Sequence, residues 1–246
     1  MDTTDAQPTG IKRAILGIVG AQVAIAAALI VIDLADAMPR IDPLTRQVPS
    51  GPATRPYSPD RAPTTSPDGA PSNAPMPERL EISGEGTTVT LTGQIAVGDG
   101  DRITGELATR ANAGQRVETI RLNSTGGSVS DALEIGDVIR ASGMSTTLEE
   151  SAVCLSACPY IFAGGVARTV AQTAKLGVHQ HYFGESAILP AFMAVEDVQR
   201  GQAEVMAHLA RMGIGLGVME HALRTPPEQI YMLSREELTE YSFVTE

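Results

Sequence analysis

One uncharged stretch near the N-terminus limits what the whole chain can become. Residues 14–32, AILGIVGAQVAIAAALIVI, carry no charged side chain and one strongly polar one, Gln22. At about 1.5 Å per residue this stretch makes a helix of about 28 Å, close to the hydrocarbon thickness of a bilayer. We therefore predict a membrane-spanning helix, because the residues that follow hold too few apolar side chains to bury it in a soluble core.

The charges beside this stretch predict its orientation. Lys12 and Arg13 precede it, whereas acidic residues follow it. Basic residues stay on the cytoplasmic side, so residues 1–13 are expected in the cytoplasm and the C-terminal domain in the periplasm or outside, anchored to the inner membrane by a single span. A cleaved signal peptide is the alternative, since ADA at 35–37 has the form of a cleavage site, although the apolar run is long for one. Both interpretations export the rest of the chain.

Composition divides the exported part in two. Residues 33–78 are rich in proline, serine, threonine and aspartate, and we predict a disordered, semi-rigid linker because they offer little apolar surface to offset ordering entropy. Residues 79–246 have the composition of one globular domain. The formal net charge of −11 argues against a nucleic-acid partner.

Strand-like and helix-like patterns alternate within this domain. Residues 87–95 and 117–123 are rich in β-branched side chains, as strands are, whereas Ile103, Leu107 and Ala111 are spaced along one helical face. Further strand-like runs precede Ser156 and contain the HQH sequence at 179–181. The alternation predicts an α/β layered domain with a parallel sheet.

A glycine turn joins one predicted strand to a helix. Gly126 and Gly127 follow the strand, Ser128 or Ser130 can cap the helix, and the helical pattern ends near Gly143. The N–H groups at such a turn could stabilise an oxyanion, although glycine turns of this kind are also common in purely structural roles.

The sequence CLSACPYIFAGG places Ser156 midway between Cys154 and Cys158. A serine that opens a helix after a parallel strand lies at the sheet edge where ligands bind. His179 or His181 could reach it from the next strand. Ser156 is therefore a candidate nucleophile.

Four motifs resemble the Clp protease proteolytic subunit family in order and spacing, over roughly residues 88 to 246. They are VTLTGQI, LNSTGGSVSDALEIGDVI, SACPYIFAGG and KLGVHQ, and the C-terminal IYMLSREELTEYSFVT is similar as well. The resemblance implies the ClpP/crotonase fold, with Ser156 as nucleophile and His179 as general base. It also implies an oxyanion hole made of the backbone N–H groups of Gly127 and Ala157. A serine hydroxyl needs both a neighbouring base and such donors to attack a carbonyl.

The chain departs from the family at the catalytic acid. Counting back eight residues from Ser234 leads to Pro226, which cannot orient an imidazole. Glu228 or Glu220 could replace the acid, or the site could be a Ser/His dyad of reduced activity. His181 is a second candidate base, but the His-Gln pair of the family favours His179.

Three other basic residues are less favoured as site residues. His208 and His221 fall in helical sequence and are predicted to lie on the surface. Lys175 suggests a Ser/Lys dyad of the kind in signal peptide peptidases, which its place four residues before His179 disfavours. The ATPase partner of intracellular Clp subunits is not expected beyond the membrane, where ATP is lacking, whereas a homo-oligomer is compatible with the resemblance.

Cys154 and Cys158 are the only cysteines of the chain. In an oxidising compartment such a pair normally forms a disulfide, which here would fix a sharp bend at Ser156. Free thiols are one alternative. A zinc site with His179 and His181 is another, but the His-x-His spacing sends the two rings to opposite faces of a strand. We predict the disulfide, with no metal and no cofactor.

These observations predict a membrane-anchored, extracytoplasmic serine peptidase that acts on a peptide or protein substrate. The first alternative is a catalytically inactive interaction module that keeps the fold. The second is a Cys/His metal-binding domain. Acyl-CoA chemistry is less compatible with a domain that faces away from the cytoplasm.

Overall fold

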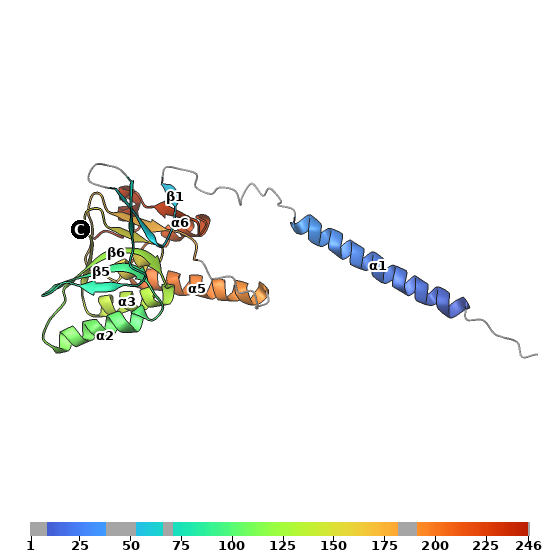
Figure 1. Cartoon of the computed structure of the whole chain (residues 1–246), viewed down its shortest axis with the longest axis horizontal. Coiled ribbons are helices and arrows are strands. Elements are labelled where there is room, and N and C mark those ends of the chain that lie inside the picture. The colour runs from blue at the N-terminus through green and yellow to red at the C-terminus, as the bar shows by residue number, and fades with distance from the viewer. Residues whose placement is uncertain (1–8, 38–52, 66–70, 182–190, 246) are drawn as a thin grey trace, which may run out of the picture. The chain divides into compact units, whose positions relative to one another are not determined.

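The computed structural model describes residues 9–37, 53–65, 71–181 and 191–245 and divides into two units, residues 1–47 and 48–246. The first unit contains α1 (Thr9–Ala37), a continuous helix (Figure 1). Its span Arg13–Val31 is apolar, and none of it is buried within the part of the chain that the structure describes. This helix is therefore long and apolar enough to cross a membrane, as the sequence predicts.

The second unit is built on a mixed sheet. In the part of the chain that the structure describes, nine strands join in one sheet with the order β1-β11-β10-β8-β6-β5-β4, and β7 links β6 to β9. β5, β6, β7, β8, β9 and β10 pair in parallel, whereas β1, β4 and β11 join antiparallel. The strands are β1 (Thr54–Pro56), β4 (Glu81–Ser83), β5 (Thr88–Ile95), β6 (Thr119–Gly127), β7 (Ser145–Leu148), β8 (Val153–Leu155), β9 (Arg168–Val170), β10 (Lys175–Val178) and β11 (Gln229–Met232).

Helices follow the parallel strands and cover the sheet. On α2, Ile103 and Leu107 are buried as their spacing predicts. On α3, the Ser128 hydroxyl caps the first turn by accepting the N–H of Asp131. Both helices lie below β5 and β6 in Figure 1. The helices are α2 (Asp99–Asn112), α3 (Val129–Ala141), α4 (Cys158–Ala163), α5 (Ala191–Arg211), α6 (Val218–Arg224) and α7 (Arg235–Glu240). The predicted α/β class with parallel strands is confirmed.

The structure differs from the linker prediction for residues 33–78. α1 continues to Ala37, β1 lies within this range, and β2 (Arg61–Thr65) pairs with β3 (Pro71–Pro75). β1 occupies a sheet edge, where a proline does not interrupt the ladder. Backbone pairing forms β1, β2 and β3 even though their composition provides few apolar side chains, and the expectation of disorder is wrong for these strands.

The expectation that His208 lies on the surface is also wrong. His208 is fully buried, with Nε2 3.1 Å from the carbonyl oxygen of Tyr160 and Nδ1 3.0 Å from the carboxylate of Asp137. Gly136 makes room for the ring, because a Cβ there would lie only 3.0 Å from the His208 Cε1. His221 is mostly buried as well, stacked on Tyr231 with ring centroids 4.3 Å apart.

A buried carboxylate joins three elements at the start of α2. Asp99 has no exposed surface, and its Oδ1 accepts hydrogen bonds from Arg79 (2.6 Å) and Arg102 (2.7 Å). Its Oδ2 accepts the N–H groups of Leu80 and Ala96, both at 2.9 Å. Burial by itself would raise the pKa of Asp99, but these donors outweigh it and lower the pKa below its usual value. The ionised carboxylate therefore contributes to stability.

We predict that Asp99→Ala lowers the free energy of unfolding by about 3 kcal/mol, because two backbone donors and two guanidinium groups lose their acceptor. Because the pKa of Asp99 is lowered on folding, its contribution is complete above the unfolded pKa of about 3.9 and is lost as pH falls below it. Urea unfolding of the detergent-solubilised full chain at pH 7 and pH 3 measures both effects.

The matched control is Asp101→Ala, two residues further along the same helix and exposed. It should change the unfolding free energy by about 1 kcal/mol at most. Equal stability of the two variants at pH 7 would contradict the role given to Asp99.

Candidate active site

Ser156 lies at a sharp bend between β8 and α4. Its φ of 60° is in the left-handed region that non-glycine residues seldom adopt. Its N–H donates to the carbonyl oxygen of Gly177 on β10 at 3.0 Å. Gly126 approaches the bend so closely that a Cβ there would lie 2.6 Å from the Ser156 Cβ and 2.8 Å from the Ala157 nitrogen. The bend therefore depends on a glycine in the neighbouring strand.

A disulfide between Cys154 and Cys158 spans this bend. The two Cα atoms are 5.0 Å apart, whereas four steps of extended chain would separate them by about 13 Å. Both cysteines are fully buried. The predicted disulfide is thus seen, and it leaves no thiolate at this pair for zinc. Among the described residues, no group of three or more His, Cys, Asp and Glu side chains is arranged to hold a metal.

His179 follows β10 and meets the serine. Its Nε2 lies 2.7 Å from the Ser156 Oγ, and its Nδ1 lies 3.0 Å from the carbonyl oxygen of Pro227. A carbonyl oxygen can only accept, so Nδ1 carries the hydrogen and Nε2 presents a lone pair to the serine hydroxyl. The structure brings together the two residues predicted as nucleophile and base.

A backbone carbonyl lies next to Nδ1 of His179. Neither Glu220 nor Glu228, the two predicted substitutes for the catalytic acid, takes this position. Glu220 forms an exposed ion pair with Arg224 at 2.9 Å. Glu228 is exposed at the edge of the site, and its charge acts on His179 only through space. Sequence analysis missed Pro227 because a backbone acceptor has no residue signature. The adjacent prolines at 226 and 227 were the available signal, since they restrict the turn that presents this carbonyl.

The electrostatic surroundings keep His179 neutral. Burial lowers the pKa of His179 below its ordinary value, while hydrogen bonding with the backbone of Gln229 and Pro227 and the charge of Glu228 act in the opposite direction. Burial and the neighbouring His179 lower the pKa of His181 to about 4. His181 forms its own hydrogen bond, with Nε2 2.6 Å from the Tyr160 hydroxyl. His179, and not His181, is therefore the imidazole that contacts Ser156.

The two backbone N–H groups predicted for an oxyanion hole are those of Gly127 and Ala157. Gly127 pairs with Ile95, and the N–H of Ser128 donates to the Ile95 carbonyl at 2.7 Å. In this parallel register the backbone of Ile95 forms its hydrogen bonds with the residues on either side of Gly127 and not with Gly127 itself. The N–H of Gly127 therefore points away from β5. Ala157 follows Ser156, and its N–H has no acceptor among the described residues. Both groups are available for an oxyanion.

A single pocket of about 570 Å³ is lined by Ser156, His179 and Gly127. Tyr57 and Pro59 form part of its wall, although both come from the segment predicted as linker. Tyr57 is the only aromatic residue between positions 33 and 78, which was a signal that this segment has a partner. Among the described residues, the lining is Tyr57, Pro59, Gln94, Gly127, Val129, Ser156, His179, His181, Pro227 and Glu228.

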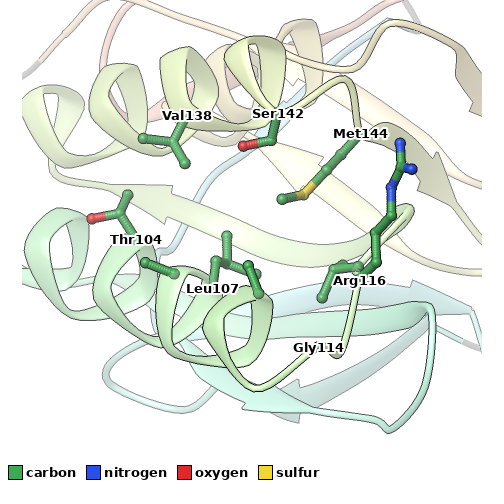
Figure 2. A pocket seen from close by; sticks show the side chains of 10 residues that line it. Thr104, Leu107, Gly114, Arg116, Val138, Ser142 and Met144 are labelled. Carbon is green, nitrogen blue, oxygen red and sulfur yellow. The ribbon is translucent and has the colours of Figure 1, made fainter.

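The remaining candidates lie elsewhere. Lys175 is exposed at the start of β10, four residues or about 13 Å along the strand from His179, so the Ser/Lys dyad is not formed. A second pocket of about 390 Å³ lies between α2 and α3, where Figure 2 shows Leu107 and Val138 facing one another. It contains none of the predicted site residues.

Comparison with known proteins adds no relative to this picture: no model of a known protein family matches the chain, and no curated protein matches its sequence.

We predict that protein purified without reductant contains no titratable thiol when denatured, and two after reduction, matching the two cysteines of the chain. A Cys154→Ser/Cys158→Ser variant should lose about 2 kcal/mol of unfolding free energy, because the loop that the disulfide closes is short. Thiol titration and urea unfolding measure these effects. Two reactive thiols in unreduced protein would contradict the disulfide.

Proposed function

We propose that this chain is a serine peptidase of ClpP/crotonase-like fold, anchored to the inner membrane with its domain in the periplasm. The observation that carries the proposal is the 2.7 Å contact between the Ser156 Oγ and the His179 Nε2, with Nδ1 held by the Pro227 carbonyl. The glycine turn before α3 and the parallel order of β5, β6, β8 and β10 support the fold assignment.

The geometry supports acyl transfer to the serine. The Ser156 Oγ attacks the peptide carbonyl while His179 Nε2 takes its proton, and the N–H groups of Gly127 and Ala157 stabilise the oxyanion. His179 then gives this proton to the leaving amine as the C–N bond breaks. Water, deprotonated by the same imidazole, attacks the acyl-enzyme; the ester C–O bond breaks, His179 returns the proton to the Ser156 Oγ, and the acid product leaves.

The backbone carbonyl of Pro227 fulfils only part of the role of a catalytic acid. It selects the productive tautomer of His179, but a neutral oxygen stabilises the imidazolium less than a carboxylate does. Glu228 adds a weak through-space attraction. We therefore expect slow turnover. The neutral acceptor at Nδ1 is also the observation that favours the second candidate, an inactive interaction module.

Membrane anchoring and export rest on three further features. α1 has the length and composition of a span, Lys12 and Arg13 flank it on one side, and the disulfide suits an oxidising compartment. An ATPase partner is not part of the proposal.

A fluorophosphonate probe tests the peptidase proposal. We expect covalent labelling of Ser156 in the wild type and none in Ser156→Ala. His179→Ala should slow labelling by about 100-fold or more, since the general base is lost. Because the pKa of His179 is lowered, the acid limb of the rate profile should have its midpoint below about pH 6.5. Labelling rates between pH 4 and pH 8 check each point.

His181→Ala and Glu228→Ala serve as matched controls from the same pocket. The first should label as the wild type does, and the second should be slowed a few-fold at most. Labelling that persists unchanged in purified Ser156→Ala, or a wild type that is inert while folded, would exclude the peptidase and favour the inactive module.

The topology has its own test. Alkaline phosphatase fused to the C-terminus should be active, and green fluorescent protein at the same place should be dark, because the charge asymmetry around α1 favours export of the domain. The reverse pattern would refute the proposed location.

A further inference from the structure

Residues 54–59, which precede the predicted domain of residues 79–246, form hydrogen bonds on two sides of the pocket that contains Ser156 and His179. β1 pairs antiparallel with β11, and the N–H of Tyr57 donates to the carbonyl oxygen of Glu228 at 3.0 Å. Two residues later, the carbonyl oxygen of Pro59 accepts the Thr125 hydroxyl at 2.6 Å. The backbone of residues 54–59 therefore passes from the turn that presents the Pro227 carbonyl to the end of β6.

The Tyr57 side chain bridges the same two regions. Its ring meets His179 edge-on, with centroids 4.6 Å apart and an angle of 67° between the planes. Its hydroxyl donates to the carbonyl oxygen of Thr125 at 2.7 Å, and the side chain lines the same pocket as Ser156. Thr125 immediately precedes Gly126 and Gly127, which form the predicted oxyanion turn. One side chain thus contacts both the base and the strand that carries the proposed oxyanion donor.

We propose that Tyr57 is a positioning residue that holds the His179 imidazole and the Gly127 turn at a fixed separation around Ser156. We call the contacts of Tyr57 with His179 and Thr125 the clamp. Its effect on catalysis rests on the proposed function, whereas the contacts themselves do not. The ring restricts His179 to the orientation in which Nε2 faces the serine. The hydroxyl restrains Thr125, and through it the direction of the Gly127 N–H.

The two parts of the side chain have separable effects. Without the hydroxyl, the oxyanion turn loses one restraint but the ring still covers His179. Without the ring, water reaches the imidazole. Because burial lowers the pKa of His179, exposure to water should raise it. Among the described residues, the other groups that face His179 are Ser156, Glu228 and His181. Removing the hydroxyl or the ring of Tyr57 changes none of these three residues.

The experiment compares Tyr57→Phe, Tyr57→Ala and the control Ser58→Ala in the full chain. Ser58 is the exposed neighbour of Tyr57 and lines no part of the pocket. Phosphonylation of Ser156 by the fluorophosphonate probe should slow about tenfold in Tyr57→Phe with an unchanged pH midpoint, as expected for one lost hydrogen bond. Tyr57→Ala should be slower still, and its acid limb should move to higher pH. Ser58→Ala should match the wild type.

A second measurement makes the result independent of activity. The His179 Cε1–H resonance, followed by NMR as pH is varied, should report a higher pKa in Tyr57→Ala and an unchanged pKa in Tyr57→Phe. If the wild type does not react with the probe, this shift still supports the clamp while the peptidase proposal fails. If the probe reacts but both Tyr57 variants match the wild type in rate and in the His179 pKa, the clamp is overturned and the peptidase proposal stands.

Discussion

The bend at Ser156 is the constraint on which the remainder of the site depends. β8 lies inside the sheet between β6 and β10, so its end is held by parallel partners on both sides. In the parallel register Leu155, the residue before Ser156, pairs with Gly177. His179 lies two residues beyond Gly177. The chain then reverses at Ser156 into α4, and the disulfide closes around the reversal. A change in the bend would move the hydroxyl relative to an imidazole that the sheet holds in place.

The features that sequence could predict are those encoded by local pattern. Ile103 and Leu107 are buried because a helical period of apolar residues needs a surface to cover. Ser156 was recognisable because it follows a strand-like run and opens a helix, at the sheet edge where ligands bind, within a motif that resembles a known family. Gly126 and Gly127 adopt φ values of 97° and 142°, which their residue type permits. In each case the chain itself carries the information within a few residues.

The features that could not be predicted from the sequence depend on contacts between distant segments. His208 falls in a helical pattern, and only the packing of α5 against α4 decides that its ring is buried beside Tyr160. Residues 54–59 were assigned to a linker from composition, which counts apolar side chains and takes no account of backbone pairing with β11. The acceptor at His179 Nδ1 was sought among carboxylates, because only side chains are visible in a sequence.

Backbone groups make most of the polar contacts around Ser156 and His179. The Nδ1 acceptor is the carbonyl of Pro227, the Ser156 N–H pairs with the carbonyl of Gly177, and the Tyr57 hydroxyl bonds the carbonyl of Thr125. At these positions the backbone makes the contact, so the size and shape of the side chain matter more than its chemical groups. Gly127 illustrates this, because a Cβ there would lie 2.2 Å from the Ile95 carbonyl oxygen. Such a site can keep its geometry while the residues that supply its carbonyls vary, provided that glycine and proline remain where the backbone must turn. The Pro227 carbonyl is one case: it fixes the orientation and tautomer of the His179 imidazole as a carboxylate would, but as a neutral oxygen it stabilises the protonated form less.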